Sequence, residues 1–310
     1  MYRILFMKGG RMNYYNEIKN ELIDNELIKK AKDYSKNKSD LIHYYNVGKL
    51  IVEAQGGEKR AKYGDGLIRE YSKKLTNDLG RGFNNSTLKR MRQFYIIIKK
   101  GATLSHQLSW SHYVEILTLD DINEINYYIE LSFNYNLGVR ELRHKIKLKE
   151  YERLDDKTKN KLIKKEETKI TDFIKNPIVL RNGLNIENIS EKYLKKLILE
   201  DLDSFLKELG NGFMYVGNEY KIRIGNVFNY IDILLFNVKY NCYVVVELKI
   251  SELKKEHIGQ IEVYMNYIDK NVKEITNDKT IGIIICKKDN KLVLEYSSDP
   301  RIFSTTYALL

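Results

Sequence analysis

The stretch from Asn229 to Tyr267 constrains the fold of this chain more than any other part of its sequence. Two β-type runs, Tyr230–Phe236 and Cys242–Ile250, are separated by a five-residue polar connection, and a helical pattern follows from about residue 256. Runs of branched and aromatic residues joined this closely predict a hairpin of two strands. Further strand and helix patterns on both sides predict an α/β domain, with helices packed against a sheet.

Charged side chains stand within these apolar runs. Asp232 lies in the first run, and Glu247 and Lys249 follow three consecutive valines in the second. Residues two apart on a strand point to the same face, so Glu247 and Lys249 project together, and pairing of the runs brings Asp232 near Glu247. Buried charges are costly unless they have a task, and two carboxylates suit Mg²⁺. The lysine then orients or deprotonates an attacking water, or offsets charge in the transition state.

Gln260 and Tyr264 lie four residues apart in the helical segment that follows, so they share one helix face and are able to point at the same spot. The alternative is that Asp232 sits at a strand edge and that Glu247 and Lys249 form a solvated pair, because E-x-K is a very common tripeptide. The combination of an upstream acid, an apolar run ending in E-x-K, and a downstream Q-x-x-x-Y favours an active site.

The order Asp, then E-x-K, then Q-x-x-x-Y resembles the PD-(D/E)XK nuclease signature in its RecB-like form. Around it, the words YIDILLF, VVVELKI, IGQIEVYMNY and IGIIIC resemble the C-terminal domain of the YhcG-like nuclease family. Upstream, KYGDGLI, RGFNNSTLKRMRQFY, LSWSHYVEIL and VRELRHKI resemble the N-terminal domain of the same family. The resemblance runs from about Asp40 to the end of the chain.

This resemblance implies a C-terminal α/β domain of the PD-(D/E)XK type, a mixed sheet flanked by helices, behind a mostly α-helical N-terminal domain. It implies phosphodiester hydrolysis in DNA with Mg²⁺ or Mn²⁺. The implied metal ligands are Asp232 and Glu247, helped by a backbone carbonyl of the second strand. Lys249 would position or activate water, and Gln260 and Tyr264 would contact the substrate phosphate or hold Lys249.

The chain departs from the family pattern at two places. The pattern has an acid on the first helix of the core, where this chain has Lys195. Glu191, one turn earlier on the same face, or Glu200 is the alternative source of that acid, and without one we expect weaker metal binding or slower catalysis. The pattern also has Trp-Ser where this chain has Leu137-Gly138.

The net charge of +11 is unevenly distributed along the sequence. Residues 1–180 hold 35 Lys and Arg against 24 Asp and Glu, whereas residues 181–310 hold 18 of each. A basic part beside a neutral part with an acidic site predicts that one half binds a polyanion and the other half cuts it. The alternative is a surface that is generically basic.

No acidic residue lies between Asp78 and Glu115. The helix expected to end near Lys100 is basic and follows a helix and a glycine-containing turn, which resembles a helix-turn-helix arrangement. The alternative is a helix with one packed and one solvated face. A second basic helix is expected at Val139–Glu150. The predicted nucleic-acid contacts on these segments are Arg81, Lys89, Arg90, Arg92, Arg140, Arg143 and Lys145.

The predicted organisation has four parts: 1–12 as a leader or disordered segment with Met12 as the natural start, 13–152 as a helical nucleic-acid-binding domain, 153–175 as a charged linker, and 176–310 as the nuclease-like domain. Within the last part we expect a long helix at 189–209 and a helix near 256–270. The expected strands are 212–217, 220–225, 230–236, 242–250, 280–286, 291–297 and 302–308.

Several classes of protein are disfavoured. The only cysteines, Cys242 and Cys286, lie in expected core strands, which favours buried reduced thiols over a disulfide or metal site. No apolar run approaches the ~20 residues of a membrane span, so we expect a cytoplasmic protein without a membrane partner. DNA is the expected substrate. RNA stays open because the site residues do not specify the sugar, and a homodimer stays open too. The alternative function is a nucleic-acid-binding accessory protein whose nuclease fold is catalytically weak or inactive.

Overall fold

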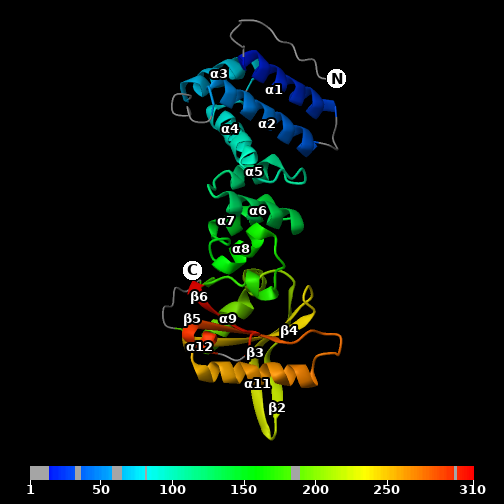
Figure 1. Cartoon of the computed structure of the whole chain (residues 1–310), viewed down its shortest axis with the longest axis vertical. Helices are drawn as coiled ribbons and strands as arrows, with labels where there is room; N and C mark the ends of the chain where they lie inside the picture. Colours follow the sequence, from blue (N-terminus) through cyan, green and yellow to red (C-terminus); the bar gives the residue numbers. More distant parts are fainter. Residues whose placement is uncertain (1–13, 32–35, 58–64, 81, 183–188, 297–298) are drawn as a thin grey trace. The chain divides into compact units, whose positions relative to one another are not determined.

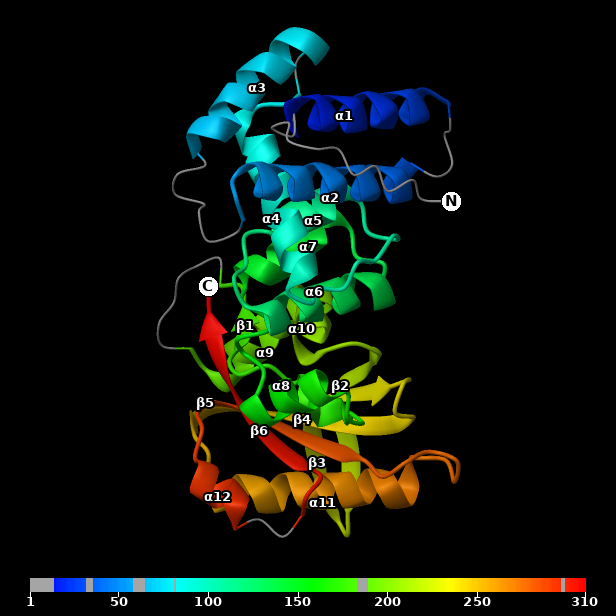
Figure 2. The same cartoon turned by 45° about the horizontal axis from the view of Figure 1, so that its top comes forward.

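The computed structural model describes residues 14–31, 36–57, 65–80, 82–182, 189–296 and 299–310 (Figure 1, Figure 2). The chain divides into two compact units, Met1–Tyr151 and Glu152–Leu310. The predicted leader and Arg81 lie outside the described residues. None of the described helices is both long enough and apolar enough to cross a membrane.

The described part of the first unit is helical. Its helices are α1 (Tyr14–Ala31), α2 (Lys36–Ala54), α3 (Asp65–Leu79), α4 (Asn85–Lys99), α5 (Trp110–Ile116), α6 (Ile122–Asn134) and α7 (Val139–Lys147). Apolar side chains at helical spacing form a core shared by the first four helices, among them Ile18, Leu22, Val47, Ile51, Ile68, Leu75, Leu88 and Met91.

The crossing of α2 and α4 depends on a glycine. A Cβ atom built on Gly48 would lie 2.1 Å from the carbonyl oxygen of Met91, so only a residue without a side chain lets the two helix backbones approach this closely. Helix α4 begins where Asn84 accepts a hydrogen bond from the backbone N–H of Thr87 at 2.9 Å. This packing fixes the buried face of α4 and leaves its basic side chains outside.

The second unit is built on a six-stranded mixed sheet in the order β1-β6-β5-β4-β3-β2. Strands β1, β6, β5 and β4 run parallel to one another. The pairs β4–β3 and β3–β2 are antiparallel. The strands are β1 (Ile178–Leu180), β2 (Phe213–Ile224), β3 (Val227–Asn237), β4 (Cys242–Glu252), β5 (Ile281–Lys288) and β6 (Ile302–Leu309). The predicted pairing of the two central runs is confirmed by the β3–β4 register.

Helices cover both faces of this sheet, which is why its central strands are apolar on both sides. Val244 and Val246 of β4 pack into one cluster with α9 (Glu191–Glu200) and α10 (Leu202–Leu209). Val245 packs into the other cluster with α11 (Lys255–Asn271), which Figure 1 and Figure 2 show lying across the sheet. The predicted α/β class, with a mixed sheet between helices, is confirmed.

Three expected elements differ. The long helix at 189–209 is two helices, because Asp201 leaves helical geometry and its carboxylate accepts from the N–H of Ser204 as the cap of α10. The expected strands 212–217 and 220–225 form the single strand β2, with a register shift between Tyr215 and Gly217. The expected strand at 291–297 is wrong, since residues 291–295 form the helix α12 (Lys291–Glu295). So short an apolar run fits either period.

The charged segment 153–175 is not a linker in the structure. It contains α8 (Asp156–Lys164) and the 3₁₀ helix η2 (Ile170–Phe173), and it belongs to the second unit. Lys161 of α8 pairs with Asp172 at 2.9 Å, and Arg153 donates to Glu208 of α10 at 3.0 Å. Lys161 and Arg153 therefore have structural partners, which composition alone does not reveal.

Candidate active site

The site lies where β3 and β4 separate. Their ladder runs from Asn237–Cys242 to Ile233–Val246 and ends there. In place of the next backbone contact, the Oδ2 atom of Asp232 accepts a hydrogen bond from the N–H of Leu248 at 3.0 Å. The separation leaves the Asp232 carboxylate between the strands, and one register step beyond Ile233–Val246 sets Asp232 opposite Glu247.

Glu247 is buried, with 2% of its surface exposed. Its Oε2 accepts hydrogen bonds from Lys249 Nζ at 3.3 Å and from Gln260 Nε2 at 3.2 Å. Its Oε1 is buried and has no hydrogen-bond partner among the described residues. Burial, and then the charge of Asp232, raise the pKa of the Glu247 carboxyl to about 7, against the opposing effect of Lys249.

The two predicted helix residues support Glu247. Gln260 and Tyr264 share the face of α11 that is turned to β4, and Gln260 Nε2 donates to Tyr264 Oη at 3.1 Å as well as to Glu247. Tyr264 is 5% exposed, so it sits behind Gln260 rather than in reach of a substrate phosphate. Gln260 thus contacts Glu247, and neither Gln260 nor Tyr264 hydrogen-bonds Lys249 in the described ranges. The contact of Gln260 with a substrate phosphate stays a prediction.

Lys195, expected only as the replacement of an acid, points directly into the site. Its Nζ lies 2.7 Å from Asp232 Oδ1 and also donates to Glu219 Oε1. Only 13% of its side chain is exposed. Burial alone would lower the pKa of this ammonium, but the hydrogen bonds to Asp232 and Glu219 outweigh it and hold the pKa above its usual value. An ammonium therefore occupies one side of a carboxylate that was predicted to bind metal.

Sequence reasoning missed Glu219 and His257. Glu219 of β2 has a left-handed backbone, with φ of 48°, and is skipped in the ladder to β3. The Gly217-Asn218 pair in the sequence indicates an irregular strand here, but it does not indicate that Glu219 contacts Lys195. His257 begins α11, where its Nδ1 accepts from the N–H of Lys254. Burial, and then the nearby Lys249 charge, lower the pKa of His257.

A cleft of about 670 Å³ opens beside the site. Lys195 and Glu219, the two groups that join Asp232 to α9 and β2, both line it. The other lining residues are Ser190, Lys192, Tyr193, Lys196, Leu199 and Glu200. With three lysines in its walls, the cleft suits an anionic ligand more than a cation.

The residues fit one divalent cation. Mg²⁺ and Mn²⁺ prefer oxygen ligands, and Glu247 Oε1 is a buried oxygen that lacks a partner beside a second carboxylate, Asp232. Among the described residues, no three His, Cys, Asp or Glu side chains form a metal-binding cluster. The site therefore holds two carboxylates, Asp232 and Glu247, each paired with an ammonium, Lys195 and Lys249.

Comparison with known proteins finds matches for both units. Residues 171–309 match the model of the YhcG PDDEXK nuclease domain, and residues 20–153 match that of the DUF1016 N-terminal domain. In both units the chain is similar to the YhcG-like family. A protein of Escherichia coli strain K12 named "Putative nuclease YhcG" is 28% identical over 282 residues, covering 78% of this chain and 75% of that protein.

Solved structures overlap only in part with this YhcG-like chain. A repair endonuclease from Pyrococcus abyssi is 18% identical with a TM-score of 0.28, covering 39% of this chain and 48% of that one. The EndoMS-dsDNA2 complex is 19% identical with a TM-score of 0.28, covering 42% and 48%. This chain matches about half the length of these structures, and such scores support no conclusion about it.

Neither Glu191 nor Glu200, the two alternatives for the acid on the first core helix, lies with the carboxylates of this YhcG-like site. Glu200 pairs with Lys196 at 3.6 Å on the surface of α9, and Glu191 acts on the titration of His257. No cluster of three metal-binding side chains exists in the described ranges, so neither residue joins Asp232 and Glu247 in one. Lys195 itself takes the position beside Asp232.

The DUF1016-type unit presents some of the predicted phosphate contacts on its surface. Lys89 and Arg90 of α4 are exposed, as is Arg140 of α7. Arg143 of α7 is exposed but makes a bidentate hydrogen bond to Glu115 of α5, at 2.7 and 3.0 Å. That bond lowers the pKa of the Glu115 carboxyl, which also feels the charge of Arg90.

Two other predicted contacts in this unit have internal partners. Arg92 donates to Gln55, which directly follows α2, at 2.6 Å and is half-buried. Lys145 is buried and pairs with Glu150 at 2.9 Å. The prediction for Lys145 is wrong, because its ammonium is turned into the unit. A basic residue in a helix such as that of Lys145 predicts a nucleic-acid contact only where it is known that the residue lies on the exposed face.

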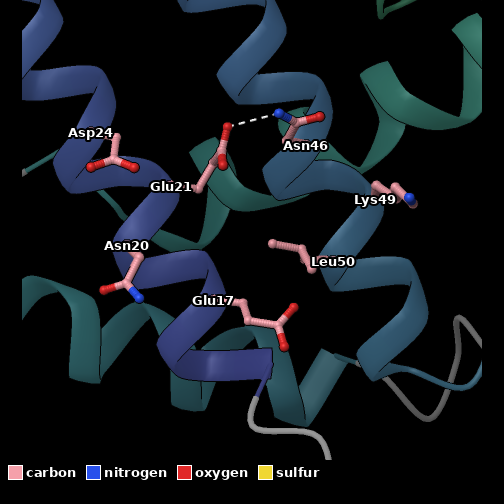
Figure 3. Close-up of a pocket in the computed structure, with 7 residues that line it drawn as sticks. All are labelled: Glu17, Asn20, Glu21, Asp24, Asn46, Lys49 and Leu50. Carbon is pink, nitrogen blue, oxygen red and sulfur yellow. Dashed lines mark hydrogen bonds between the residues drawn. The ribbon is translucent and has the colours of Figure 1, made fainter. Parts of the chain in front are cut away.

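The same unit also has an acidic hollow, shown in Figure 3. It measures about 380 Å³ between α1 and α2. Figure 3 shows Glu21 accepting from Asn46, at 2.8 Å, and His43 also contacts Glu21 at 2.6 Å. The lining residues are Glu17, Asn20, Glu21, Asp24, Asn46, Lys49 and Leu50. Phosphate is repelled from such a surface, so this hollow does not suit a nucleic acid.

Proposed function

We propose that this YhcG-like chain hydrolyses phosphodiester bonds in DNA with the help of one divalent ion, Mg²⁺ or Mn²⁺. The observation that carries the proposal is the buried Glu247 carboxylate, whose Oε1 has no hydrogen-bond partner in the described residues while Asp232 and Lys249 stand beside it. A native site rarely leaves a buried carboxylate oxygen unpaired without a ligand to satisfy it.

The residues take distinct roles in this proposal. Asp232 and Glu247 hold the ion, which when bound supplies positive charge to the phosphate and acidifies a water molecule. Lys249, whose Nζ lies 3.3 Å from Glu247, orients the attacking water by hydrogen bonding. Lys195 faces the cleft and offsets the charge that develops on the phosphate. Gln260 keeps Glu247 in place.

The basic face of the DUF1016-type unit has the chemistry to bind the nucleic acid. Lys89, Arg90, Arg140 and Arg143 are exposed there and offer cationic donors to phosphates. Binding by such contacts is independent of base sequence and weakens with salt, because phosphate neutralisation releases counterions. To contact a phosphate, the Arg143 guanidinium must first give up its ion pair with Glu115.

Nicking of supercoiled plasmid tests the proposal. Full-length protein should nick DNA in Mg²⁺ or Mn²⁺ and not in EDTA. Asp232→Asn and Glu247→Gln should each abolish nicking while the circular dichroism spectrum shows that the variant is still folded at the assay temperature. Lys249→Ala should leave folding intact and lower the rate by at least about a hundredfold. Undiminished nicking by the Asp232→Asn, Glu247→Gln double variant contradicts the assignment.

A second function is favoured by Lys195. Its ammonium neutralises Asp232 at 2.7 Å and thereby competes with a metal ion, as expected of a nucleic-acid-binding accessory protein with a weak or inactive nuclease fold. Salt-sensitive DNA binding without nicking in either metal would establish that function. A comparison of RNA and DNA of the same sequence as substrates shows whether the protein acts on ribose or deoxyribose nucleic acid.

A further inference from the structure

Beyond the active site, β2 and β3 continue as a hairpin. Their pairing runs outward from Tyr220–Ile231 to Ile224–Val227, with the turn at residues 225–226. Figure 1 and Figure 2 both show this hairpin extending past α11. Strand β2 is the last strand of the sheet, so no other described strand covers its outer edge.

The two faces of the hairpin differ. Ile222 is 1% and Ile231 is 0% exposed, and both pack in the cluster of α11. The other face carries two cross-strand pairs, each of one cation and one aromatic ring: Lys221 with Tyr230, and Arg223 with Phe228. Cross-strand partners project on the same side of a sheet, so these four side chains form one surface, called here the hairpin face.

The hairpin face is exposed and positively charged. Phe228 is 51% and Tyr230 is 49% exposed, although large aromatic rings are normally buried. Lys221 Nζ lies 3.8 Å from the centre of the Phe228 ring and Arg223 Cζ lies 5.9 Å from it, which places both cations over this one ring. No acidic residue occurs in the twelve residues 220–231.

The hairpin face begins next to the site. Tyr230 precedes Asp232 by two residues and Phe228 precedes it by four, which at about 3.3 Å per strand residue are roughly 7 and 13 Å. A nucleic-acid strand held at Asp232 and continuing along β3 meets the two cation–ring pairs in turn. Cations that follow a backbone and rings that stack on bases are the two parts of a single-strand binding surface.

We propose that the hairpin face binds unpaired nucleotides that flank the scissile bond, with phosphates on Lys221 and Arg223 and bases stacked on Tyr230 and Phe228. The inference rests on the proposed nuclease function for its placement. Unpaired nucleotides are favoured over duplex because stacking on a side chain needs an exposed base face. A second copy of the chain is disfavoured, because pairing two such edges would bring like charges together.

Binding is measured first, without metal, so that the result does not depend on cleavage. Full-length protein in EDTA is titrated into single-stranded oligonucleotides that carry 2-aminopurine, whose fluorescence falls on stacking, and into a blunt duplex. Phe228→Leu and Tyr230→Leu should each weaken single-strand binding about tenfold and reduce the quenching, which matches stacking of about 1.4 kcal/mol per ring. Tyr230→Phe keeps the ring and should bind as the parent does.

Matched controls separate stacking from charge and from folding. Lys157→Gln with Lys164→Gln removes two exposed cations from α8, outside the hairpin, and should leave the quenching unchanged. Lys221→Gln with Arg223→Gln should weaken binding and lower its salt dependence by about two phosphate contacts. Melting curves show that each variant is folded.

The outcomes decide the proposal. Unchanged quenching and affinity in both Leu variants overturn it. An equal loss of affinity for the blunt duplex also overturns it, because the face would then contact phosphates alone. A change of mass in sedimentation, with nucleic-acid binding intact, would assign the face to a second copy instead. If the parent protein binds and stacks but cuts nothing, the nuclease proposal fails while the hairpin assignment stands. If the parent cuts, the Leu variants should lose the preference for substrates with unpaired flanks.

Discussion

At the scale of single residues, Lys195 makes the site unusual. A carboxylate that would bind metal already holds an ammonium at 2.7 Å, and that ammonium is shared with Glu219. Most of the contact is shielded from water, since the exposed fractions of the Lys195 and Asp232 side chains are 13% and 17%. Removing one member of so enclosed a pair leaves the other charge uncompensated.

Lys195→Met should therefore destabilise the metal-free protein and strengthen metal binding. We expect a loss of about 1–3 kcal/mol in the free energy of unfolding, because Asp232 loses its cation but keeps the N–H of Leu248. Calorimetric titration should show tighter Mg²⁺ binding, since Asp232 Oδ1 is freed. The matched control is Lys196→Met, whose side chain is 63% exposed and pairs with Glu200. Equal Mg²⁺ affinity of parent and Lys195→Met protein contradicts the prediction.

Glu247 should make stability depend on pH. Its pKa is raised from 4.5 to about 7 by burial and by Asp232, so between these values the folded state keeps a proton that the unfolded state has released. Stability from this group is present below about pH 4.5 and is lost as the pH rises to about 7. Glu247→Gln should remove that loss, so its melting temperature should exceed the parent's at pH 8 and approach it at pH 5. A parallel decline in both proteins would refute this origin.

The residues of the site were predictable from sequence only where they are local. Asp232, Glu247 and Lys249 follow from strand alternation, and the four-residue spacing of Gln260 and Tyr264 places them on one helix face. The Lys195–Asp232 contact joins residues far apart in the chain, so neither spacing nor composition indicates it. The burial of Lys145 went unseen for a different reason: its partner Glu150 is only five residues away, but the packing of the unit decides that the pair is buried.

At the scale of elements, the predictable parts are those with a strong period. The central strands of the second unit are uninterrupted branched runs, and their limits fall within a few residues of the expected ones. The errors lie at short or irregular segments. A single capping residue, Asp201, divides an expected long helix, and the helix α12 is only five residues long. In such segments the hydrophobic period does not indicate where a helix begins or ends, and local capping residues determine it.

The α2–α4 crossing gives an element-scale prediction. Gly48→Ala places a methyl group 2.1 Å from the Met91 carbonyl oxygen, which is backbone and must move with its helix. We expect a loss of about 1–3 kcal/mol in the stability of the first unit, or failure to fold. Gly66→Ala in α3 is the control: nothing lies within 4 Å, so it should be neutral or stabilising by up to about 1 kcal/mol. Thermal unfolding followed by circular dichroism compares the two, and equal melting temperatures would contradict the steric account.

At the scale of the whole molecule, charge and fold divide at the same place. Residues 1–151 hold 27 Lys and Arg against 18 Asp and Glu, and residues 152–310 hold 26 against 24. The unit boundary lies between Tyr151 and Glu152, so most of the positive excess belongs to the helical unit. Charge counts along the sequence anticipated this division, although the boundary had been placed within a linker that the structure lacks.

The two units should accordingly differ in DNA binding when expressed apart. A fragment of residues 1–151 should bind duplex DNA with an affinity that falls steeply between 50 and 200 mM salt, because phosphate contacts release counterions. A fragment of residues 152–310 should bind the same duplex more weakly, since its charges nearly balance. Fluorescence anisotropy at several salt concentrations measures both. Arg90→Gln with Arg140→Gln should reduce the salt slope of the first fragment. Equal affinities and slopes of the two fragments would show that the charge division does not govern binding.

The Lys195–Asp232 contact also has a consequence for how ligands influence one another. With Asp232, Glu219 and Glu247 ionised, the two lysines Lys195 and Lys249 nearly balance the site before any ligand arrives. A divalent ion alone leaves an excess of positive charge, which a phosphodiester cancels. Each ligand thereby favours the other, and thermodynamic linkage requires both affinities to change by the same factor. Cation and nucleic acid should thus bind cooperatively, each filling the site weakly on its own.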